Sequence, residues 1–310
     1  MTSEKRLQVL CLAGPTGAGK TDLAIEFARH FNGEIVNADS RQLYADFPII
    51  TAQPDAAQLS AARHHLYGIL PLSAKMSAGE WTRLAGRICG EIHGRGHLPI
   101  VVGGTGFYFE ALLHGLAQMP EVPTAVSEGV AARLDEEGPE CLHRELRRID
   151  PVYAARIHCH DRQRIQRAME VYLASGKTFT WWHERGRLPA EAAGPLLGLD
   201  ATLAALEPRL AQRIDLMLEQ GAMAETARAW EKCPNLNVPG WSGIGCREML
   251  AHWQGEISLA QCKARWLAAT RAYAKRQLTW FRGRKNMIWC ENGDVAAAIA
   301  QAENELNARR

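Results

Sequence analysis

A glycine-rich segment near the start of the chain has the residue types and spacing of a phosphate-binding loop. Apolar residues 9–13 precede it as a short buried strand, and residues 21–31 follow it with the apolar spacing of a helix. The segment consists of Gly14, Pro15, Thr16, Gly17, Ala18, Gly19, Lys20 and Thr21. Glycines let backbone N–H groups approach phosphate oxygens, and the positive end of the helix points at the same anion. Lys20 adds a mobile positive charge and the Thr21 hydroxyl suits Mg²⁺, so the segment predicts a di- or triphosphate site without specifying ATP.

A carboxylate that holds Mg²⁺ in many phosphate-loop ATPases is missing from its usual place at the end of a second apolar strand. The best candidate strand, residues 99–102, runs into a glycine-rich turn, whereas the acid follows residues 34–37 as Asp39. This argues against a motor or a switch. Opposite a phosphate loop, Asp39 suits a general base for an incoming nucleophile, although an aspartate in this position is also a common helix N-cap. Arg41 and Gln42 beside it suit recognition of a base edge or a phosphate.

Positive charge is concentrated near the end of the chain. Residues 257–290 contain no Asp or Glu, in a chain whose formal net charge is only +2. The basic residues in this stretch are Lys263, Arg265, Arg271, Lys275, Arg276, Arg282, Arg284 and Lys285. Trp266, Tyr273, Trp280 and Phe281 lie among them. Unopposed positive charge with aromatics is typical of a nucleic-acid surface; the alternative is a solvated helix face whose aromatics point into the core.

A second basic cluster precedes it in the middle of the chain, at Arg156, Arg162, Arg164 and Arg167. Two such clusters around a phosphate-loop core indicate a polyanion that contacts both regions. His158, Cys159 and His160 resemble metal ligands in composition, but adjacent residues are poorly spaced for a closed tetrahedral site.

The order of elements predicts an α/β protein, with a P-loop NTPase-like parallel sheet core and an inserted all-helical subdomain. Strands at 9–13, 34–37 and 98–102 alternate with helices at 21–31 and 81–93, which is typical of a parallel sheet covered on both faces. Residues 120–195 lack a convincing strand, and further helices are expected at 208–220 and 259–281. We therefore expect a first core part at 1–118, a helical insert at 119–195 and a second core part at 196–310.

Composition indicates an ordinary globular protein of 310 residues, 47% of them hydrophobic. No segment has the pattern of a signal peptide, and no apolar run approaches the roughly 20 residues of a membrane span. The eight cysteines are scattered without a Cys-x-x-Cys pair, so they are expected to be reduced thiols in a cytoplasmic protein that does not bind membranes.

Five motifs in this order together resemble the bacterial tRNA dimethylallyltransferase family, also called the tRNA isopentenyl transferases. The resemblance extends from the first strand to about Arg284. Its motifs are Gly14–Thr21, Asp39–Tyr44, Gly103–Tyr108, Arg156–His158 with Gln163–Arg167, and Lys275–Arg282.

The resemblance implies transfer of a dimethylallyl group from dimethylallyl diphosphate to the exocyclic amine of an adenosine. That adenosine lies just 3′ of the anticodon in tRNAs that read codons beginning with U. The family pattern implies Mg²⁺ dependence, recognition of the anticodon stem-loop, and diphosphate in the loop where other proteins of this class bind a nucleotide. A monomer is expected.

Matched residue by residue, the resemblance makes Asp39 the general base, with Lys20 and Thr105 at the reaction centre, where Thr105 is also expected to contact tRNA. Ser40, Arg41 and Gln42, with Asp39, match recognition of the target adenosine. Residues expected to contact tRNA elsewhere are Gln163, Arg164, Ile165, Gln166, Arg167, Arg247, Lys275, Arg276, Gln277, Trp280 and Arg282.

The chain departs from the family pattern at three positions. Ala18 replaces a serine of the loop, Gln53 replaces a lysine, and Cys246 replaces a tyrosine. None of these changes removes a residue that the chemistry requires.

Three other functions fit parts of the sequence. A small-molecule kinase and a prenyltransferase acting on free adenine nucleotides both explain the loop, but both leave the basic clusters without a role. A nucleic-acid-binding module gated by a nucleotide would hydrolyse ATP, and the missing second-strand acid counts against it.

Overall fold

The computed structural model describes residues 6–290 and 293–309. Contacts divide the chain into two compact units. One combines the chain up to Leu113 with the chain from Ala190 onward, and the other is His114–Pro189. The helical unit therefore starts and ends earlier than the predicted 119–195. Its end moves because β6 (Ala192–Ala193) pairs with β1 (Leu7–Gln8), which ties these residues to the sheet unit.

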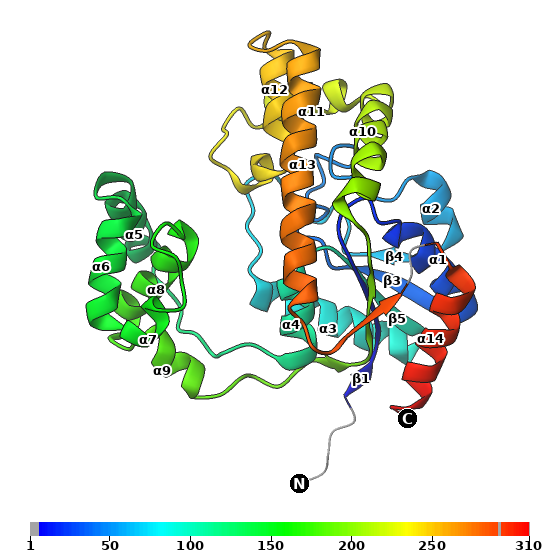
Figure 1. The fold of residues 1–310 in the computed structure, drawn as a ribbon, viewed down its shortest axis with the longest axis horizontal. Helices are drawn as coiled ribbons and strands as arrows, with labels where there is room; N and C mark the ends of the chain where they lie inside the picture. Colours follow the sequence, from blue (N-terminus) through cyan, green and yellow to red (C-terminus); the bar gives the residue numbers. More distant parts are fainter. Residues whose placement is uncertain (1–5, 291–292, 310) are drawn as a thin grey trace. The chain divides into compact units, whose positions relative to one another are not determined.

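Six parallel strands form the central sheet of the first unit, in the order β4-β3-β5-β2-β7-β8 (Figure 1). The strands are β2 (Leu10–Ala13), β3 (Gly33–Asn37), β4 (His64–His65), β5 (Leu98–Gly103), β7 (Leu196–Leu199) and β8 (Met287–Cys290). Because they are all parallel, their carboxyl ends share one edge, where ligands bind in sheets of this type. The α/β class with a phosphate-loop core is confirmed.

Helices cover both faces of the sheet, which explains why every residue of β2 is buried. On one face Phe27, from α1 (Lys20–His30), belongs to a core that also includes residues of α14 (Val295–Asn307). On the other face α3 (Ala78–Gly94) and α4 (Gly106–His114) pack together, with the Trp81 ring stacked on Tyr108 at 4.2 Å. The short helix α2 (Ala56–Ala61) precedes β4.

The start of α1 is built to leave its amides free. Its N-cap is Gly19, in the left-handed region at φ 84°, and no side chain caps the first turn. Gly17 has a similar positive φ of 82°. Left-handed backbone is costly for residues with a Cβ, so glycine at these two positions lets the loop turn its N–H groups toward an anion.

The chain segment that connects β7 to β8 forms a set of helices that completes the first unit. It contains α10 (Leu203–Glu219), α11 (Ala222–Lys232), the 3-10 helix η1 (Pro239–Ser242), α12 (Cys246–Trp253) and α13 (Leu259–Arg282). The predicted start of α10 at residue 208 is wrong. The Thr202 side chain caps the helix at the Ala205 N–H, so Pro208 lies inside it at the expense of one backbone hydrogen bond.

The second unit is all helical and has its own core. Its helices are α5 (Thr124–Glu136), α6 (Pro139–Ile149), α7 (Pro151–Ala154), α8 (Arg162–Ser175) and α9 (Phe179–Glu184). Leu142, Ile165 and Met169 are fully buried there. Buried Asp150 accepts hydrogen bonds from the Tyr153 N–H at 3.1 Å and the Thr180 N–H at 2.8 Å, which ties α7 to α9.

Gly103, the last residue of β5, allows this strand to end directly against the backbone of Ala38, which precedes Asp39. A Cβ on Gly103 would lie 2.2 Å from the Ala38 carbonyl carbon and oxygen. We expect Gly103→Ala to lower the free energy of unfolding by roughly 1–3 kcal/mol, because overpacking forces the backbone to shift. Urea denaturation would measure the change.

Gly94→Ala is the matched control, since the residue belongs to α3 and no atom lies within 4 Å of the place that its methyl group would take. Alanine there should be neutral or slightly stabilising. Equal stability of the two variants would contradict the role of Gly103.

Candidate active site

The phosphate loop lies at the carboxyl edge of the sheet and opens into a cavity of about 780 Å³, here called the phosphate cavity. Gly17, Gly19, Lys20 and Thr21 line it. The Lys20 ammonium donates to the Pro15 carbonyl at 2.8 Å, which folds the side chain back along the loop. Five of the eight loop residues predicted from sequence, Thr16, Gly17, Gly19, Lys20 and Thr21, therefore line one concave site. Gly14, Pro15 and Ala18 are not part of its lining.

Among the charged side chains that line this cavity, Lys20 and Arg213 are the cations whose pKa burial lowers, and Asp39 is the carboxylate that acts on both. Burial lowers the pKa of Lys20 to about 8, with Asp39 acting in the opposite direction and Arg213 adding to the lowering. Burial also lowers the pKa of Arg213, again against the effect of Asp39. Both cations lose hydration that Asp39 replaces only in part, so an anion bound beside them would be stabilised.

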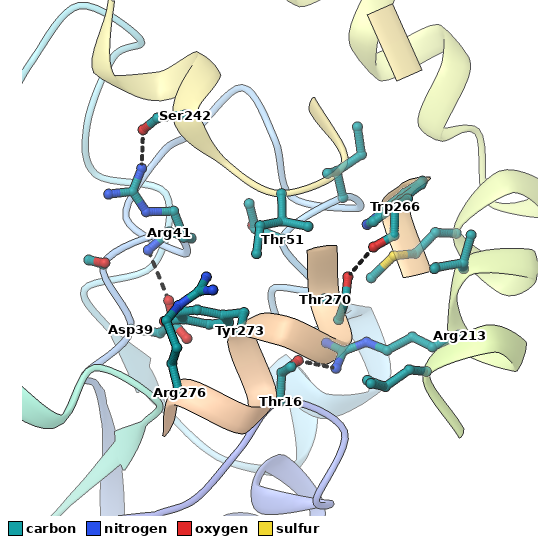
Figure 2. Close-up of a pocket in the computed structure, with 16 residues that line it drawn as sticks. Thr16, Asp39, Arg41, Thr51, Arg213, Ser242, Trp266, Thr270, Tyr273 and Arg276 are labelled. Atoms are coloured by element: carbon teal, nitrogen blue, oxygen red, sulfur yellow. Dashed lines mark hydrogen bonds between the residues drawn. The ribbon is translucent and has the colours of Figure 1, made fainter. Parts of the chain in front are cut away.

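Asp39 is held in a tight turn after β3. The Arg41 N–H donates to its Oδ1 at 2.9 Å (Figure 2). The Asp39 N–H donates to Asn37 Oδ1 at 2.8 Å. Because no helix begins in residues 40–44, the alternative that Asp39 caps a helix is wrong. Among the described residues, no donor is hydrogen-bonded to its Oδ2.

A second cavity of about 320 Å³ adjoins the first and is called here the aromatic cavity, after Trp266 and Tyr273 in its wall. Apolar side chains of α10 and the basic side chain of Arg276 complete the lining (Figure 2). Residues that line both cavities are Thr16, Asp39, Thr51, Arg213 and Met217. Asp39 thus lies where the two cavities meet.

Thr105 supports this arrangement from behind. Its hydroxyl accepts a hydrogen bond from the Ser40 N–H at 3.0 Å and donates to the Ser40 hydroxyl at 3.3 Å. Its own N–H donates to the Ala38 carbonyl at 3.1 Å. Thr105 lines neither cavity, so the structure places it behind the Asp39 turn.

Arg41 and Gln42 point in different directions. Arg41 lines the aromatic cavity and donates to the Ser242 hydroxyl. The Gln42 amide donates to the carbonyls of Thr51, at 3.1 Å, and Ala52. Gln42 lines the phosphate cavity and fixes the loop that walls it.

The basic stretch 257–290 is mostly α13, and its charges are less free than the sequence indicated. Four of the eight are paired with acids from other elements, which corrects the expectation of unopposed charge. The pairs are Lys263–Asp215, Arg271–Glu207, Arg282–Asp200 and Arg284–Glu110. Within the described residues, Arg265, Lys275 and Lys285 are exposed and form no ion pair.

Other residues expected to contact tRNA have mixed environments. Gln277 is buried, and Trp280 is partly buried beneath the Arg284 guanidinium, 4.0 Å from its ring centroid. Arg247 is exposed and donates to the Leu236 carbonyl at 2.7 Å. Because Gln277 is buried, its side chain is not accessible for the expected contact with tRNA.

In the helical unit, Gln163 and Arg164 at the start of α8 are exposed, whereas Ile165 is fully buried and presents no side chain to solvent. Gln166 and Arg167 both contact Glu170, at 2.9 and 3.3 Å. Arg162 pairs with Asp135 and Arg164 with Asp161.

The histidine and cysteine run of this unit has an acidic neighbour. Ligand atoms of Glu140, Cys159 and His160 lie within 4.8 Å of one another, and the His160 ring nitrogen is 3.2 Å from the Glu140 carboxylate. Glu140 and His160 are exposed, and the surface ion pair accounts for their contact.

The sequence did not assign Arg213 to the site, and it indicated Tyr273 only as one aromatic of the basic stretch 257–290, not as a residue of the cavity wall. Arg213 donates to the Thr16 hydroxyl at 3.3 Å, and burial raises the pKa of Tyr273 so that its hydroxyl stays protonated (Figure 2). A signal for Arg213 was present: it shares one helix face with buried Leu210 and Met217, at spacings of three and four residues. A cation on an apolar face indicates a buried anion site.

Comparisons with known proteins agree with this geometry. Residues 42–284 match the family model for IPP transferase. The tRNA dimethylallyltransferase of Desulfovibrio desulfuricans is 52% identical over 97% of this chain and 94% of its own length. That of Xanthomonas campestris is 41% identical over 97% of this chain and 95% of its own length.

Two solved structures are also similar. The tRNA isopentenylpyrophosphate transferase of Bacillus halodurans has a TM-score of 0.71 at 29% identity, with 98% of each chain covered. A eukaryotic dimethylallyltransferase acting on tRNA has a TM-score of 0.80 at 29% identity, over 98% of this chain and 80% of the other. No described helix is long and apolar enough to span a bilayer. With the family model matching most of its length and the relatives matching nearly all of it, the chain belongs to the tRNA dimethylallyltransferases, a family of prenyltransferase enzymes.

Proposed function

We propose that this chain transfers the dimethylallyl group of dimethylallyl diphosphate to the exocyclic amine of the adenosine 3′ of the anticodon, in tRNAs reading U-initial codons. The observation that carries the proposal is the position of Asp39, between a phosphate cavity and an aromatic cavity. One side suits a diphosphate leaving group and the other an adenine ring.

The leaving group is the main energetic problem. As the bond between the allylic carbon and the diphosphate oxygen breaks, negative charge accumulates on the diphosphate. Loop amides, Lys20 and Arg213 surround the cavity where that charge develops, and donors fixed in advance stabilise it without reorganisation.

Mg²⁺ is the cofactor that we propose for this step. The Thr21 hydroxyl lines the phosphate cavity, and none of the described residues forms a hydrogen bond with it. Hydroxyl and diphosphate oxygens are the hard donors that Mg²⁺ prefers, so the residues fit the ion. When bound, the ion would neutralise part of the charge that develops on the diphosphate.

The nucleophile is an amine whose lone pair is delocalised into the adenine ring. Asp39 would accept a hydrogen bond from this amine and take its proton as the new N–C bond forms. Its unpaired Oδ2 leaves an acceptor available for that role. Reaching the cavity requires the adenosine to leave its stack, and the Trp266 and Tyr273 rings offer it an aromatic wall.

RNA binding by the exposed basic residues of α13 and α8 is part of the proposal, as is action of the enzyme as a cytoplasmic monomer. Arg265, Lys275 and Lys285 on or beside α13, with Gln163 and Arg164 on α8, present accessible polar or charged groups for phosphates.

The direct test incubates the purified protein with Mg²⁺, dimethylallyl diphosphate and unmodified bulk tRNA, followed by mass analysis of the digested nucleosides. We expect a new adenosine carrying one five-carbon unit. The control replaces tRNA with free adenine nucleotides, which should remain unmodified. ATP consumption with no prenylated nucleoside would support a kinase or an RNA-gated ATPase instead.

Asp39→Ala should lower kcat by roughly 10²–10⁴-fold, because it removes the proton acceptor, while tRNA affinity stays within about twofold. Single-turnover kinetics and filter binding measure the two quantities separately. Asp39→Asn preserves the turn and is the matched control for structure. Turnover at the wild-type rate in either variant would exclude Asp39 as the base.

The pH dependence of kcat/KM for dimethylallyl diphosphate should show an alkaline limb near pH 8. Lys20 is charged below its lowered pKa of about 8 in the free enzyme and loses that charge above it, so diphosphate binding weakens as the pH rises. In Lys20→Arg the guanidinium stays charged, and this limb should disappear even if the rate is lower. An identical limb in Lys20→Arg would assign it to another group.

A further inference from the structure

Gln277 is a buried polar residue on a helix whose exposed face is basic. Its side chain is 4% exposed, whereas Lys275 and Arg276 beside it are exposed. Both functional groups of its amide have partners in the active-site region. Its Oε1 accepts from the Thr16 N–H at 2.9 Å, and its Nε2 donates to the Gly104 carbonyl at 2.9 Å.

These two partners belong to the elements that form the site. Thr16 is part of the phosphate loop and lines both cavities, and its hydroxyl accepts a hydrogen bond from Arg213. Gly104 directly precedes Thr105, whose hydroxyl holds the Ser40 N–H next to Asp39. One amide therefore connects the diphosphate side of the site to the general-base side.

The fit around this amide is tight. A Cβ on Gly104 would lie 2.1 Å from Gln277 Nε2, so glycine at 104 is what allows the contact. The orientation of the amide is also determined, because Oε1 faces a donor and Nε2 faces an acceptor. Reversing or removing it would leave the buried Gly104 carbonyl and the partly buried Thr16 N–H unpaired.

We propose that Gln277 is a positioning residue for diphosphate binding, which holds the phosphate loop and the turn after β5 in a fixed relation, and not a contact to RNA. Loss of the amide would release the Thr16 N–H and let the loop and Arg213 relax from the geometry that receives the diphosphate. The effect would appear in diphosphate affinity, while the exposed face of α13 stays as it is.

The test compares Gln277→Met with Lys275→Met, a neighbouring exposed residue of the same helix. Isothermal titration with inorganic diphosphate and Mg²⁺, and separate filter binding with unmodified tRNA, give two affinities for each variant. We expect Gln277→Met to weaken diphosphate binding roughly tenfold, with tRNA affinity within about twofold of wild type. Lys275→Met should show the opposite pattern.

In steady state, Gln277→Met should raise KM for dimethylallyl diphosphate and leave KM for tRNA unchanged. Unchanged diphosphate affinity in a folded variant would overturn the proposal, and a selective loss of tRNA affinity would make Gln277 an RNA contact. These titrations use diphosphate itself. A wild-type protein that binds diphosphate but makes no prenylated tRNA would therefore refute the proposed function without affecting the role of Gln277.

Gln277→Glu is a second variant that tests the same hydrogen bond if Gln277→Met does not fold. The introduced carboxylate keeps an acceptor for the Thr16 N–H but loses the donor to the Gly104 carbonyl, and protonation restores that donor. Diphosphate affinity relative to wild type at the same pH should therefore recover as the pH falls. A ratio that is independent of pH would contradict the assigned hydrogen bond.

Gly104→Ala supplies an independent second variant. Because its methyl group would displace the Gln277 amide, it should weaken diphosphate binding as Gln277→Met does, and the double variant should be no weaker than either single one. Additive losses would show that the two residues act separately.

Discussion

The rest of this structure depends on the interaction of two partly buried cations, Lys20 and Arg213, with the Asp39 carboxylate. Burial lowers the pKa of both Lys20 and Arg213, and Asp39 offsets only part of that cost. Partly desolvated positive charge on Lys20 and Arg213 is unfavourable in an empty site and favourable around a diphosphate. The left-handed glycines of the loop and the packing of α10 against α13 are the means by which the fold keeps these charges in place.

The same arrangement separates two tasks that would interfere if one group performed both. Charge stabilisation belongs to the loop, Lys20 and Arg213, which line the phosphate cavity. Proton transfer suits Asp39, which the Arg41 N–H and the Thr105–Ser40 contact hold at the border with the aromatic cavity. Because the parallel strands β2, β3 and β5 end at one edge, residues far apart in sequence meet there without any long connecting segment.

Local patterns predicted most of what local physics determines. The strand, glycine turn and helix around Lys20, the class of fold, and the cavity position of Asp39 follow from short-range spacing. Arg213 and Gln277 could not be assigned in that way, because their partners lie 197 and 261 residues away at Thr16. The predicted start of α10 at residue 208 is too late because the Thr202 cap, which no periodicity reveals, begins the helix earlier.

The basic helix shows how folding changes the meaning of a charge count. Its sequence contains no acid, yet α10, the segment after β7 and α4 bring four carboxylates to it. Exposed pairs of this kind contribute little to stability, about 0–1 kcal/mol each, so their basic side chains can exchange a carboxylate for a phosphate at small cost. What the pairs do reduce is the field at a distance, since it reflects net charge. The surface is therefore suited to recognising RNA on close contact more than to attracting any polyanion from far away, which is consistent with an enzyme that must select one position in one kind of RNA.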